Sequence, residues 1–444
     1  MSGMARPADI GILAAEIYFP KTYVEQSELE SFDNVGKGKY TLGLGQLRMS
    51  CIGDREDINS ISSTVVVNLL EKNHVSPRDI GRLEIGTETI QDKAKSTKTF
   101  LMNLFKGNEG IEGITTINAC YGGIQAFFNT VAWIESRAWD GRLGIVVAAD
   151  IAVYERGPAR ATGGAGAVAF LIGPNAPLVL APIRSTYMVH AYDFYKPIPQ
   201  SEYPVVDGHH SIDCYIDAIH NCYESLKQKT GTTKIEELAE YLCFHAPFYK
   251  MTRRAFNKMF LTDMLNHPKV YKADFSFTQN PNIKDPKVYE IVNRLSQEAW
   301  NRKCEPATFL GKQLGNLYCG SLPASLISLI CDPTIDLKGK RVLLFAYGSG
   351  LASSMFTLYM RPDAQNFINQ LRANNPIRDL LQNRIKLTPD EYTRRMDKRE
   401  SDYVKTNYTP RDPLDEIPEG AFYLVKTDNK WRRFYARKIA RPKL

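Results

Sequence analysis

The pattern of hydrophobic and polar positions is clearest in residues 111–137, which read IEGITTINACYGGIQAFFNTVAWIESR. A β-branched run at 114–117 leads into Asn118-Ala119-Cys120 and then into two glycines. Apolar side chains next recur at helical spacing, at positions 124, 127, 128, 131 and 134. We therefore predict a strand, a sharp turn that glycine permits, and a helix, with Cys120 at or just before the helix start.

Strand and helix patterns alternate along both halves of the chain. The expected strands lie at 9–18, 83–87, 141–153, 163–173, 241–244 and 341–346. The expected helices lie at 56–72, 212–228 and 287–302. Continuous apolar strands are typical of sheets covered on both faces. The alternation therefore predicts an α/β fold with covered sheets.

Two composition changes divide the chain further. The run Gly173-Pro174-Asn175-Ala176-Pro177 is the best boundary signal, and the sequence becomes more charged after Pro362. Thr388 followed by Pro389 predicts a capped helix. Residues 421–437 predict a terminal hairpin about Asp428-Asn429.

Composition narrows the class of protein. The 444 residues are 43% hydrophobic and 24% charged, which is ordinary for a globular protein, and no apolar run approaches the length of a membrane span. The N-terminus lacks the pattern of a secretory leader, so we expect a cytoplasmic protein. Eight scattered cysteines without a CxxC pair favour a reducing compartment over a zinc site or a disulfide scaffold. The net charge of +7 suits an anionic small ligand, and no motif indicates nucleic acid.

Cys120 is the first candidate for chemistry. At a helix start, free amide groups and the helix dipole lower a thiol pKa from about 8.5 towards about 3.5–7.5, and the thiolate is the nucleophile. The alternative is a small buried core cysteine, which most free cysteines are. The local pattern alone leaves both interpretations open.

Two further residues follow predicted strands, where crevices form. His245 comes after the run 241–244 and before Ala246-Pro247, and Glu88 comes just after 83–87. An imidazole or a carboxyl group there can act as a general acid or base. The alternatives are a satisfied structural histidine and a carboxylate that caps a turn.

Cations and glycines suit the binding of an anionic ligand. The loop Gly36-Lys37-Gly38-Lys39 and the segment 250–254 supply positive charges suited to phosphates, although the Walker spacing is absent. Gly348-Ser349-Gly350 permits close backbone approach, which by itself is a weak signal.

Twelve motifs together resemble those of the eukaryotic 3-hydroxy-3-methylglutaryl-CoA (HMG-CoA) synthase family, nearly from end to end. They are YTLGLGQ (40–46), DREDINS (54–60), GRLEIGTETI (81–90), NACYGG (118–123), WIESRAWDGR (133–142), DIAVY (150–154), TGGAGAVAFLIGPNAPL (162–178), HAYDFYKP (190–197), SEYPVVDG (201–208), FHAPFYK (244–250), GNLY (315–318) and YGSGLA (347–352).

The resemblance implies a thiolase-like fold, with two similar α/β halves in a five-layered αβαβα arrangement, in a homodimer. Residues 1–175 would form the half with Cys120 and Glu88. Residues 176–444 would form the half with His245, with a C-terminal helical and hairpin extension from about 362.

The resemblance also implies the reaction and the residue roles. Cys120 would be acetylated by acetyl-CoA, Glu88 would be the general acid/base that forms the methyl carbanion, and His245 would bind and polarise acetoacetyl-CoA. Water would then release HMG-CoA, in the mevalonate pathway of isoprenoid and sterol synthesis, without a metal or redox cofactor. The positions matching acyl or CoA contacts are Thr162, Ser211, Asn316, Ser349, Lys39, Lys250 and Arg254, and Asp150 and Asp193 match supporting acidic residues.

Departures from the family pattern keep two alternatives open. Pro158 stands for an Asn, Lys37 for a small residue and Arg254 for a Lys, and Pro323 and Ala324 replace a Tyr and a Gly. We expect an active enzyme with altered turnover or affinity. The alternatives are an impaired homologue that serves as a binding or dimer-partner subunit, and an acyl-carrier-protein-dependent ketoacyl or β-branching synthase.

Overall fold

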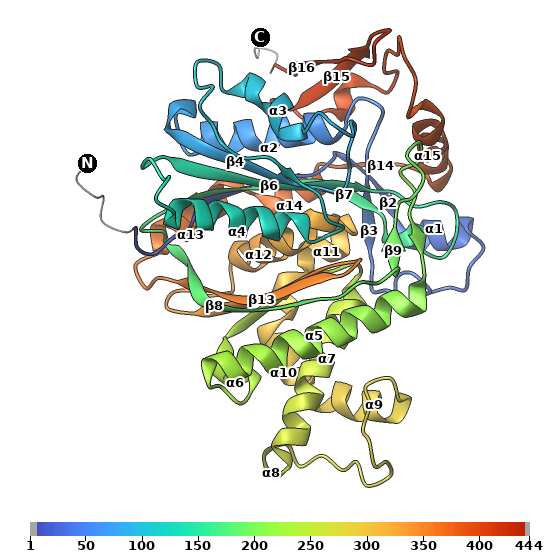
Figure 1. Ribbon diagram of the computed structural model, residues 1–444. Helices are drawn as coiled ribbons and strands as arrows, with labels where there is room; N and C mark the ends of the chain where they lie inside the picture. The colour runs from blue at the N-terminus through green and yellow to red at the C-terminus, as the bar shows by residue number, and fades with distance from the viewer. Residues whose placement is uncertain (1–6, 440–444) are drawn as a thin grey trace.

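The computed structural model describes residues 7–439; residues 1–6 and 440–444, which the two predicted halves include, lie outside the described residues. Two sheets and three layers of helices alternate through the molecule (Figure 1). The helices that form the three layers are α2 (Ile58–Lys72) and α3 (Thr97–Leu101) on one outer face, α4 (Gly122–Glu135) and α12 (Ser321–Cys331) in the middle, and α5 (Gly208–Thr230) and α7 (Tyr249–Asn266) on the other outer face. The predicted five-layered α/β fold is confirmed.

The two sheets repeat one strand pattern. The first contains, in spatial order, β1 (Gly11–Tyr18), β7 (Gly164–Gly173), β6 (Leu143–Ala152), β4 (Ile80–Gly86) and β5 (Thr115–Thr116). The second contains β8 (Leu178–Met188), β13 (Ala352–Met360), β12 (Arg341–Gly348) and β11 (Tyr241–Phe244). From β1 and from β8, the first two pairings are antiparallel and the third is parallel. This shared order reveals an internal duplication that no repeat in the sequence discloses.

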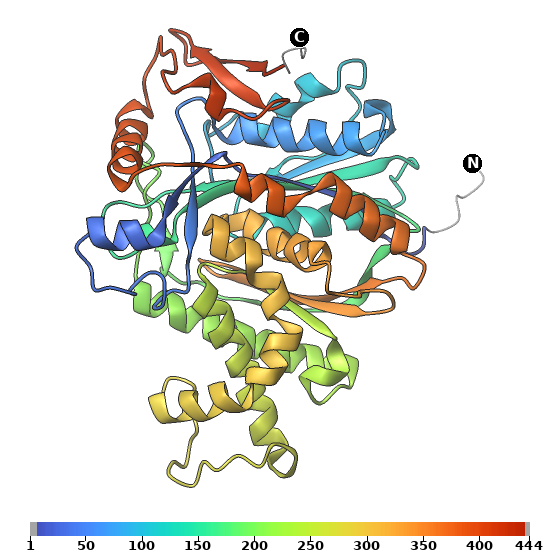
Figure 2. The same ribbon diagram turned by 180° about the vertical axis from the view of Figure 1, so that it is seen from behind.

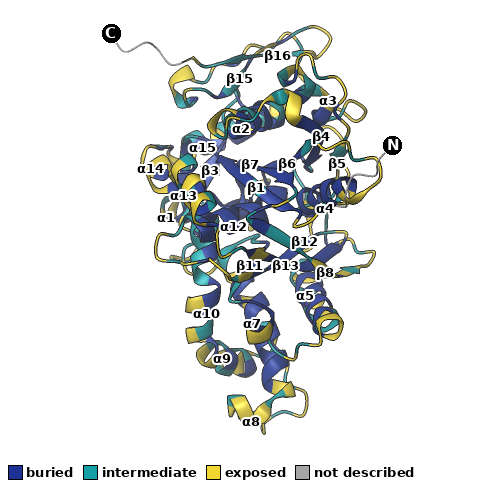
Figure 3. Cartoon of the chain, turned by 90° about the vertical axis from the view of Figure 1, so that its left-hand side faces the viewer, coloured by how far each residue is buried: buried dark blue, intermediate teal, exposed yellow. Residues whose placement is uncertain are grey.

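The sheets are continuous at one short junction, where Gly11 pairs with Val179 and Ile12 with Leu178. Alternating side chains of each strand enter different layers. On β12, Val342 and Leu344 lie in the central core, whereas Leu343 and Phe345 pack with the outer helices. Both faces are covered, so the strand must be apolar throughout. Figure 3 shows these buried central strands, with α8 (Pro268–Tyr271) exposed beyond them.

One predicted helix is wrong in its extent. The stretch 287–302 forms two helices, α9 (Pro286–Leu295) and α10 (Gln297–Lys303), which meet at Ser296. The buried hydroxyl of Ser296 bonds to the Asn257 side chain at 2.8 Å, and this tertiary contact fixes the break between the helices.

The chain after Pro362 returns to the N-terminal half, on the side seen in Figure 2. Its elements are α13 (Gln365–Asn374), α14 (Ile377–Gln382), β14 (Ile385–Lys386), α15 (Pro389–Asp402), β15 (Phe422–Thr427) and β16 (Arg433–Arg437). β14 pairs with β2 (Thr22–Glu25), which also pairs with β3 (Arg48–Cys51), and β15 packs on α2. The predicted capped helix and terminal hairpin are both confirmed. The division at residue 175, which groups this extension with the C-terminal half, stays a prediction.

Smaller helices complete the fold: α1 (Gln26–Phe32), α6 (Ile235–Leu238) and α11 (Phe309–Leu314). Within residues 7–439, none of the helices combines the length and apolar character needed to cross a bilayer.

Candidate active site

Two glycine contacts bring the candidate residues together. A Cβ on Gly86, the last residue of β4, would lie 2.2 Å from the Gly123 nitrogen. A Cβ on Gly348, the last residue of β12, would lie 1.8 Å from the Ala119 oxygen. Only glycine fits at such contacts, so the ends of β4 and β12 close on the turn that precedes α4. Both strands therefore deliver the residues that follow them to Cys120.

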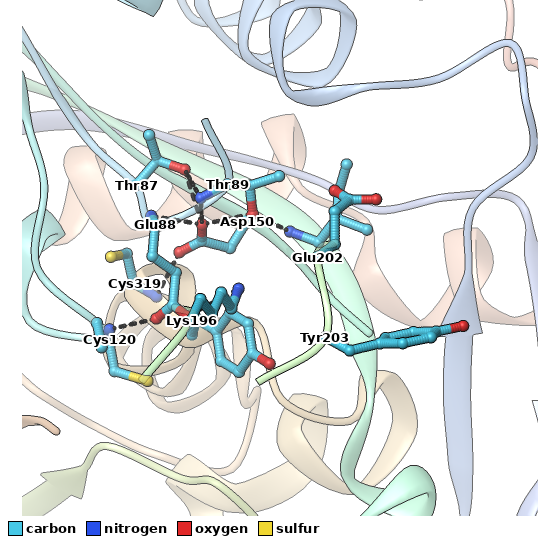
Figure 4. Close-up of polar contacts among 12 residues, drawn as sticks. Thr87, Glu88, Thr89, Cys120, Asp150, Lys196, Glu202, Tyr203 and Cys319 are labelled. Atoms are coloured by element: carbon cyan, nitrogen blue, oxygen red, sulfur yellow. Dashed lines mark hydrogen bonds and ion pairs between the residues drawn. The ribbon is translucent and has the colours of Figure 1, made fainter. Parts of the chain in front are cut away.

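Glu88 and Cys120 meet at this point. The Cys120 amide donates to Glu88 Oε2 at 2.7 Å (Figure 4). Cys120 itself lies in the left-handed region, with φ of 55°, two residues before the first residue of α4. The predicted place of the cysteine, just before the helix, is confirmed. A non-glycine residue in this conformation is strained, and such strain is typical of functional sites.

The predicted low pKa of the thiol is wrong. Burial raises the pKa of Cys120 well above its usual value, and the carboxylates of Glu88 and Asp150 raise it further, although Lys196 lowers it. Burial, together with the two nearby carboxylates, therefore disfavours the thiolate form of Cys120.

Asp150, near the end of β6, is the hydrogen-bonding centre of the site. Its Oδ1 accepts from the Thr87 hydroxyl, the Glu88 amide and both the amide and the hydroxyl of Thr89, at 2.7–2.9 Å. Its Oδ2 accepts from the Cys319 amide at 2.9 Å. Burial raises the pKa of Asp150, and the Thr87 and Cys319 hydrogen bonds oppose that rise. The carboxylate thus fixes the backbone on both sides of Glu88.

Lys196 is a site residue that sequence reasoning missed. Its Nζ lies 3.1 Å from Glu88 Oε1 and 4.9 Å from the centre of the Tyr318 ring. Burial raises the pKa of Glu88, and the ion pair with Lys196 opposes that rise. Burial works to lower the pKa of Lys196, but Glu88 and Asp150 raise it above its usual value. The sequence signal that could have identified Lys196 is its place within the aromatic motif 190–197.

Asp193 holds the loop that carries Lys196. Its carboxylate accepts from the Tyr347 hydroxyl at 2.8 Å and from the Gly350 amide at 2.9 Å. The loop is thereby attached to the turn between β12 and β13. The predicted supporting residues Asp150 and Asp193 therefore brace opposite sides of one site.

His245 directly follows β11, the strand that occupies in the second sheet the place of β4 in the first. Phe244 pairs with Phe345, and the His245 amide donates to the Phe345 oxygen at 2.9 Å. Gly348 touches the Cys120 turn three residues beyond Phe345. Strand geometry therefore places the His245 backbone on the order of 10 Å from that turn. Within the described residues, no hydrogen bond or ion pair joins His245 to Cys120 or Glu88.

Burial lowers the pKa of His245 to about 3, so its ring is neutral at physiological pH. Its Nδ1 is buried without a hydrogen-bond partner among the described groups. A neutral imidazole with an unused nitrogen is suited to hydrogen bonding with a ligand.

The structure groups two of the predicted acyl-binding residues near Cys120. The Asn316 amide donates to the Thr162 oxygen at 3.3 Å, and Asn316 Oδ1 accepts from the Tyr318 amide at 2.8 Å. Tyr318 and Tyr154 form a small apolar group against which Cys120 packs. The two tyrosines were not predicted as site residues, although both lie in the family motifs.

The other two predicted acyl-binding residues, Ser349 and Ser211, lie on different elements. Ser349 stands between Gly348, which touches Ala119, and Gly350, which donates to Asp193. Ser211 lies in the first turn of α5, where its amide bonds to the Asp207 oxygen at 2.8 Å.

The predicted cations gather at a second location, outside the buried site. The Lys250 amide donates to the Leu44 oxygen at 3.0 Å, which joins the start of α7 to the glycine loop of Lys39. Lys39, Lys250 and Arg254 are all exposed. Lys250 and Arg254 are four residues apart and share one face of α7. Arg253, between them, is buried and bonds to Asn293.

The residues that differ from the family pattern lie where the fold accommodates them. Pro158 is exposed in a turn. Pro323 is the third residue of α12, where its missing amide hydrogen breaks no helical bond, and Ala324 is buried in the central core. Within residues 7–439, no cluster of three or more His, Cys, Asp or Glu side chains is arranged to hold a metal.

Two family models match consecutive parts of the chain. The one described as "Hydroxymethylglutaryl-coenzyme A synthase N terminal" matches residues 6–177, and the one described as "Hydroxymethylglutaryl-coenzyme A synthase C terminal" matches residues 178–438. The chain belongs to the hydroxymethylglutaryl-CoA synthase family. The resemblance seen in the sequence motifs is confirmed.

Individual members of the hydroxymethylglutaryl-CoA synthase family match at full length. The chain is 45% identical to hydroxymethylglutaryl-CoA synthase A of Dictyostelium discoideum, over 98% of this chain and 92% of that protein. It is also 45% identical to the cytoplasmic hydroxymethylglutaryl-CoA synthase of Homo sapiens, over 97% of this chain and 88% of that protein. A solved structure, MvaS in complex with 3-hydroxy-3-methylglutaryl coenzyme A, aligns with a TM-score of 0.83 at 27% identity, covering 98% of this chain and 100% of that one. The chain is therefore an enzyme of the acyltransferase class, as its motifs predict.

Proposed function

We propose that this enzyme condenses acetyl-CoA, acetoacetyl-CoA and water to give HMG-CoA and free CoA. The observation that carries the proposal is the 2.7 Å hydrogen bond that places Glu88 against the Cys120 turn. A thiol beside a buried carboxyl group suits both halves of this chemistry, which are acyl transfer and removal of a proton from carbon. CoA thioester ligands are supported by the relative solved with bound HMG-CoA.

In the first step, the Cys120 sulfur attacks the carbonyl carbon of acetyl-CoA. The new bond is the acetyl–sulfur bond of Cys120, and the bond that breaks is the thioester bond to CoA. The thiol proton passes to the departing CoA sulfur. The negative charge on the thiolate is transient, because it passes to the CoA sulfur as the thioester forms and the proton neutralises it there. This sequence accommodates a thiol whose pKa Glu88 and Asp150 raise.

In the second step, Glu88 removes a proton from the acetyl methyl group. The carbanion attacks C3 of acetoacetyl-CoA, and the new alkoxide takes up a proton. His245, as a neutral imidazole, donates a hydrogen bond to the acetoacetyl group. Thr162, Asn316, Ser211 and Ser349 surround the acyl groups. Water then cleaves the Cys120 thioester and restores the free thiol, and these steps need no metal or redox cofactor.

The exposed cations suit the phosphates of CoA. Lys39, Lys250 and Arg254 lie together outside the buried site, so a long ligand would place its phosphates there and its thioester near Cys120.

We also propose a homodimer that works in the cytoplasm, in the mevalonate pathway. β5 is the edge strand of the first sheet, and Ile114 and Ile117 beside it are 60% and 61% exposed. An exposed apolar edge is a surface that a second copy can cover. The cytoplasmic location is supported by the name of the human relative.

The test is mass spectrometry of the purified protein mixed with acetyl-CoA alone, followed by addition of acetoacetyl-CoA. We expect one acetyl group on the peptide that contains Cys120, and then HMG-CoA. Cys120→Ser is the control and should carry no adduct. An unmodified wild-type Cys120, or an adduct that never yields HMG-CoA, would reject the proposal.

A further inference from the structure

Lys196 places a cation inside a site that otherwise holds two carboxyl groups and a thiol. Its ammonium group is 3.1 Å from Glu88, and only 19% of the side chain is exposed. The aromatic rings of Tyr318 and Phe194 lie 4.9 Å and 5.9 Å from the same nitrogen. Aromatic faces stabilise a desolvated ammonium group without neutralising it. The lysine is thus kept charged and held against Glu88.

The charged and titratable groups around this ammonium come from several elements. They are Glu88 after β4, Cys120 before α4, Asp150 on β6, Tyr318 before α12, Glu202 on the same loop as Lys196, and Tyr403 at the end of α15. Lys430 and Arg433 line the same cavity as Lys196, and Tyr154 and Cys319 lie beside the thiol and the carboxyl groups. Lys196 is a cation that acts on the pKa of all three central groups, and it lowers the pKa of Cys120, Glu88 and Asp150 alike.

The loop of Lys196 is fixed from two sides. Asp193 attaches it to Tyr347 and Gly350 on the second sheet. Glu202 attaches it to Arg399 of α15 by a two-pronged, partly buried ion pair with distances of 2.6 and 2.9 Å. Arg–carboxylate pairs of this form impose a defined geometry. The C-terminal extension therefore helps to hold Lys196 in the active site.

We propose that Lys196 is a positioning residue that holds the negative charge shared by Cys120, Glu88 and Asp150, so that Cys120 can be acetylated and Glu88 then stays ionised as the base. This inference rests on the proposed function. During acetylation, the thiol proton leaves with CoA and the charge on sulfur disappears, while Lys196 keeps its proton throughout. During condensation, Glu88 gains the methyl proton and loses its charge, and Lys196 again remains protonated. No further reactant is needed.

The experiment compares Lys196→Met, Lys196→Arg and wild type by the rate of Cys120 acetylation at a series of pH values. Lys93→Met is the matched control, because Lys93 is an exposed lysine that lines the same cavity as Glu88 and Lys196. We expect Lys196→Met to acetylate at least about tenfold more slowly at neutral pH, consistent with lost charge stabilisation. Its rate should recover as the pH rises, with an unchanged KM for acetyl-CoA. Lys196→Arg should retain most of the rate, and Lys93→Met should match wild type.

Three results would overturn the inference. They are a Lys196→Met protein with the wild-type rate and pH profile, equal impairment of the Met and Arg variants, and a slow Met variant whose profile does not move with pH. The last two results would indicate that Lys196 acts through the space its side chain fills and not through its charge. Absence of an adduct in wild type is a different failure, because it rejects the proposed function itself. Thermal unfolding of each variant identifies any loss of fold.

Discussion

The Cys120 amide donates to Glu88 Oε2 at 2.7 Å, so the proposed nucleophile and the proposed acid/base are joined through the backbone of one residue and the side chain of the other. The contact does not use the sulfur. Substitution of the thiol therefore leaves Glu88 in place, and substitution of Glu88 leaves the sulfur in place. Each residue can be tested without removing the other.

Glu88→Gln should make Cys120 more acidic. The Glu88 carboxylate raises the pKa of the thiol, and an amide of the same shape carries no charge. The rate of alkylation of Cys120 by iodoacetamide, followed by mass spectrometry, should therefore rise at lower pH than in wild type. Asp92→Asn, an exposed neighbour, is the control. An unchanged alkylation profile in Glu88→Gln would argue against the coupling between these groups.

Asp150→Asn should destabilise the protein and impair catalysis. The amide of asparagine offers one acceptor oxygen and turns two N–H groups toward donors, so the five donors on Asp150 cannot all be satisfied. We expect a loss of about 2–3 kcal/mol in the free energy of unfolding, measured in urea. Thr87→Val removes one donor and should lose about 1 kcal/mol. Equal stability of Asp150→Asn and wild type would contradict the structural role assigned to the Asp150 hydrogen bonds.

Glu56→Gln should stabilise the protein at alkaline pH. Burial raises the pKa of Glu56 to about 7 from an ordinary 4.5, so the folded state holds the proton more tightly than the unfolded state. The stability that Glu56 contributes is complete below 4.5 and is lost as the pH rises through about 7. The free energy of unfolding of Glu56→Gln, measured in urea, should exceed that of wild type by at most about 3 kcal/mol at pH 8, and this difference should shrink towards pH 5. Glu419→Gln, which is exposed, should show no gain at either pH.

Lys250→Ala and Arg254→Ala should weaken the binding of acetoacetyl-CoA. Each removes an exposed cation from the proposed phosphate site, and we expect roughly a threefold to tenfold rise in KM, or about 0.7–1.4 kcal/mol. The difference from wild type should shrink in high salt, because salt screens exposed charges. Lys287→Ala, at an exposed lysine near the start of α9, is the control. A KM that rises equally in all three variants would point to a nonspecific effect of charge.

The α/β class was predictable because its strands are buried on both faces, whereas the five-layered arrangement was expected only from the family resemblance. Apolar runs such as 143–152 and 164–173 are typical of strands covered on both faces. Cys120 was placed correctly by the strand pattern before it and the helix pattern after it. The internal duplication was not predictable from repeats, since it resides in strand order rather than in residue identity.

The electrostatics of the site could not be read from the sequence. The helix start predicts an acidic thiol, but burial raises the pKa of Cys120, and the carboxylates of Glu88 and Asp150, which lie 30 or more residues away along the chain, raise it further. Lys196 was likewise missed, because its partner Glu88 lies more than 100 residues earlier in the chain. Such pairs depend on the packing of distant loops, which local patterns do not specify.

The most direct test of the proposed division of labour is a single-turnover chase of acetylated enzyme with acetoacetyl-CoA, in wild type and in Glu88→Gln. Both proteins should first carry the acetyl group on Cys120. Wild type should then lose the adduct as HMG-CoA appears, whereas Glu88→Gln should remain acetylated and form no HMG-CoA. Condensation by acetylated Glu88→Gln at the wild-type rate would show that another residue is the base.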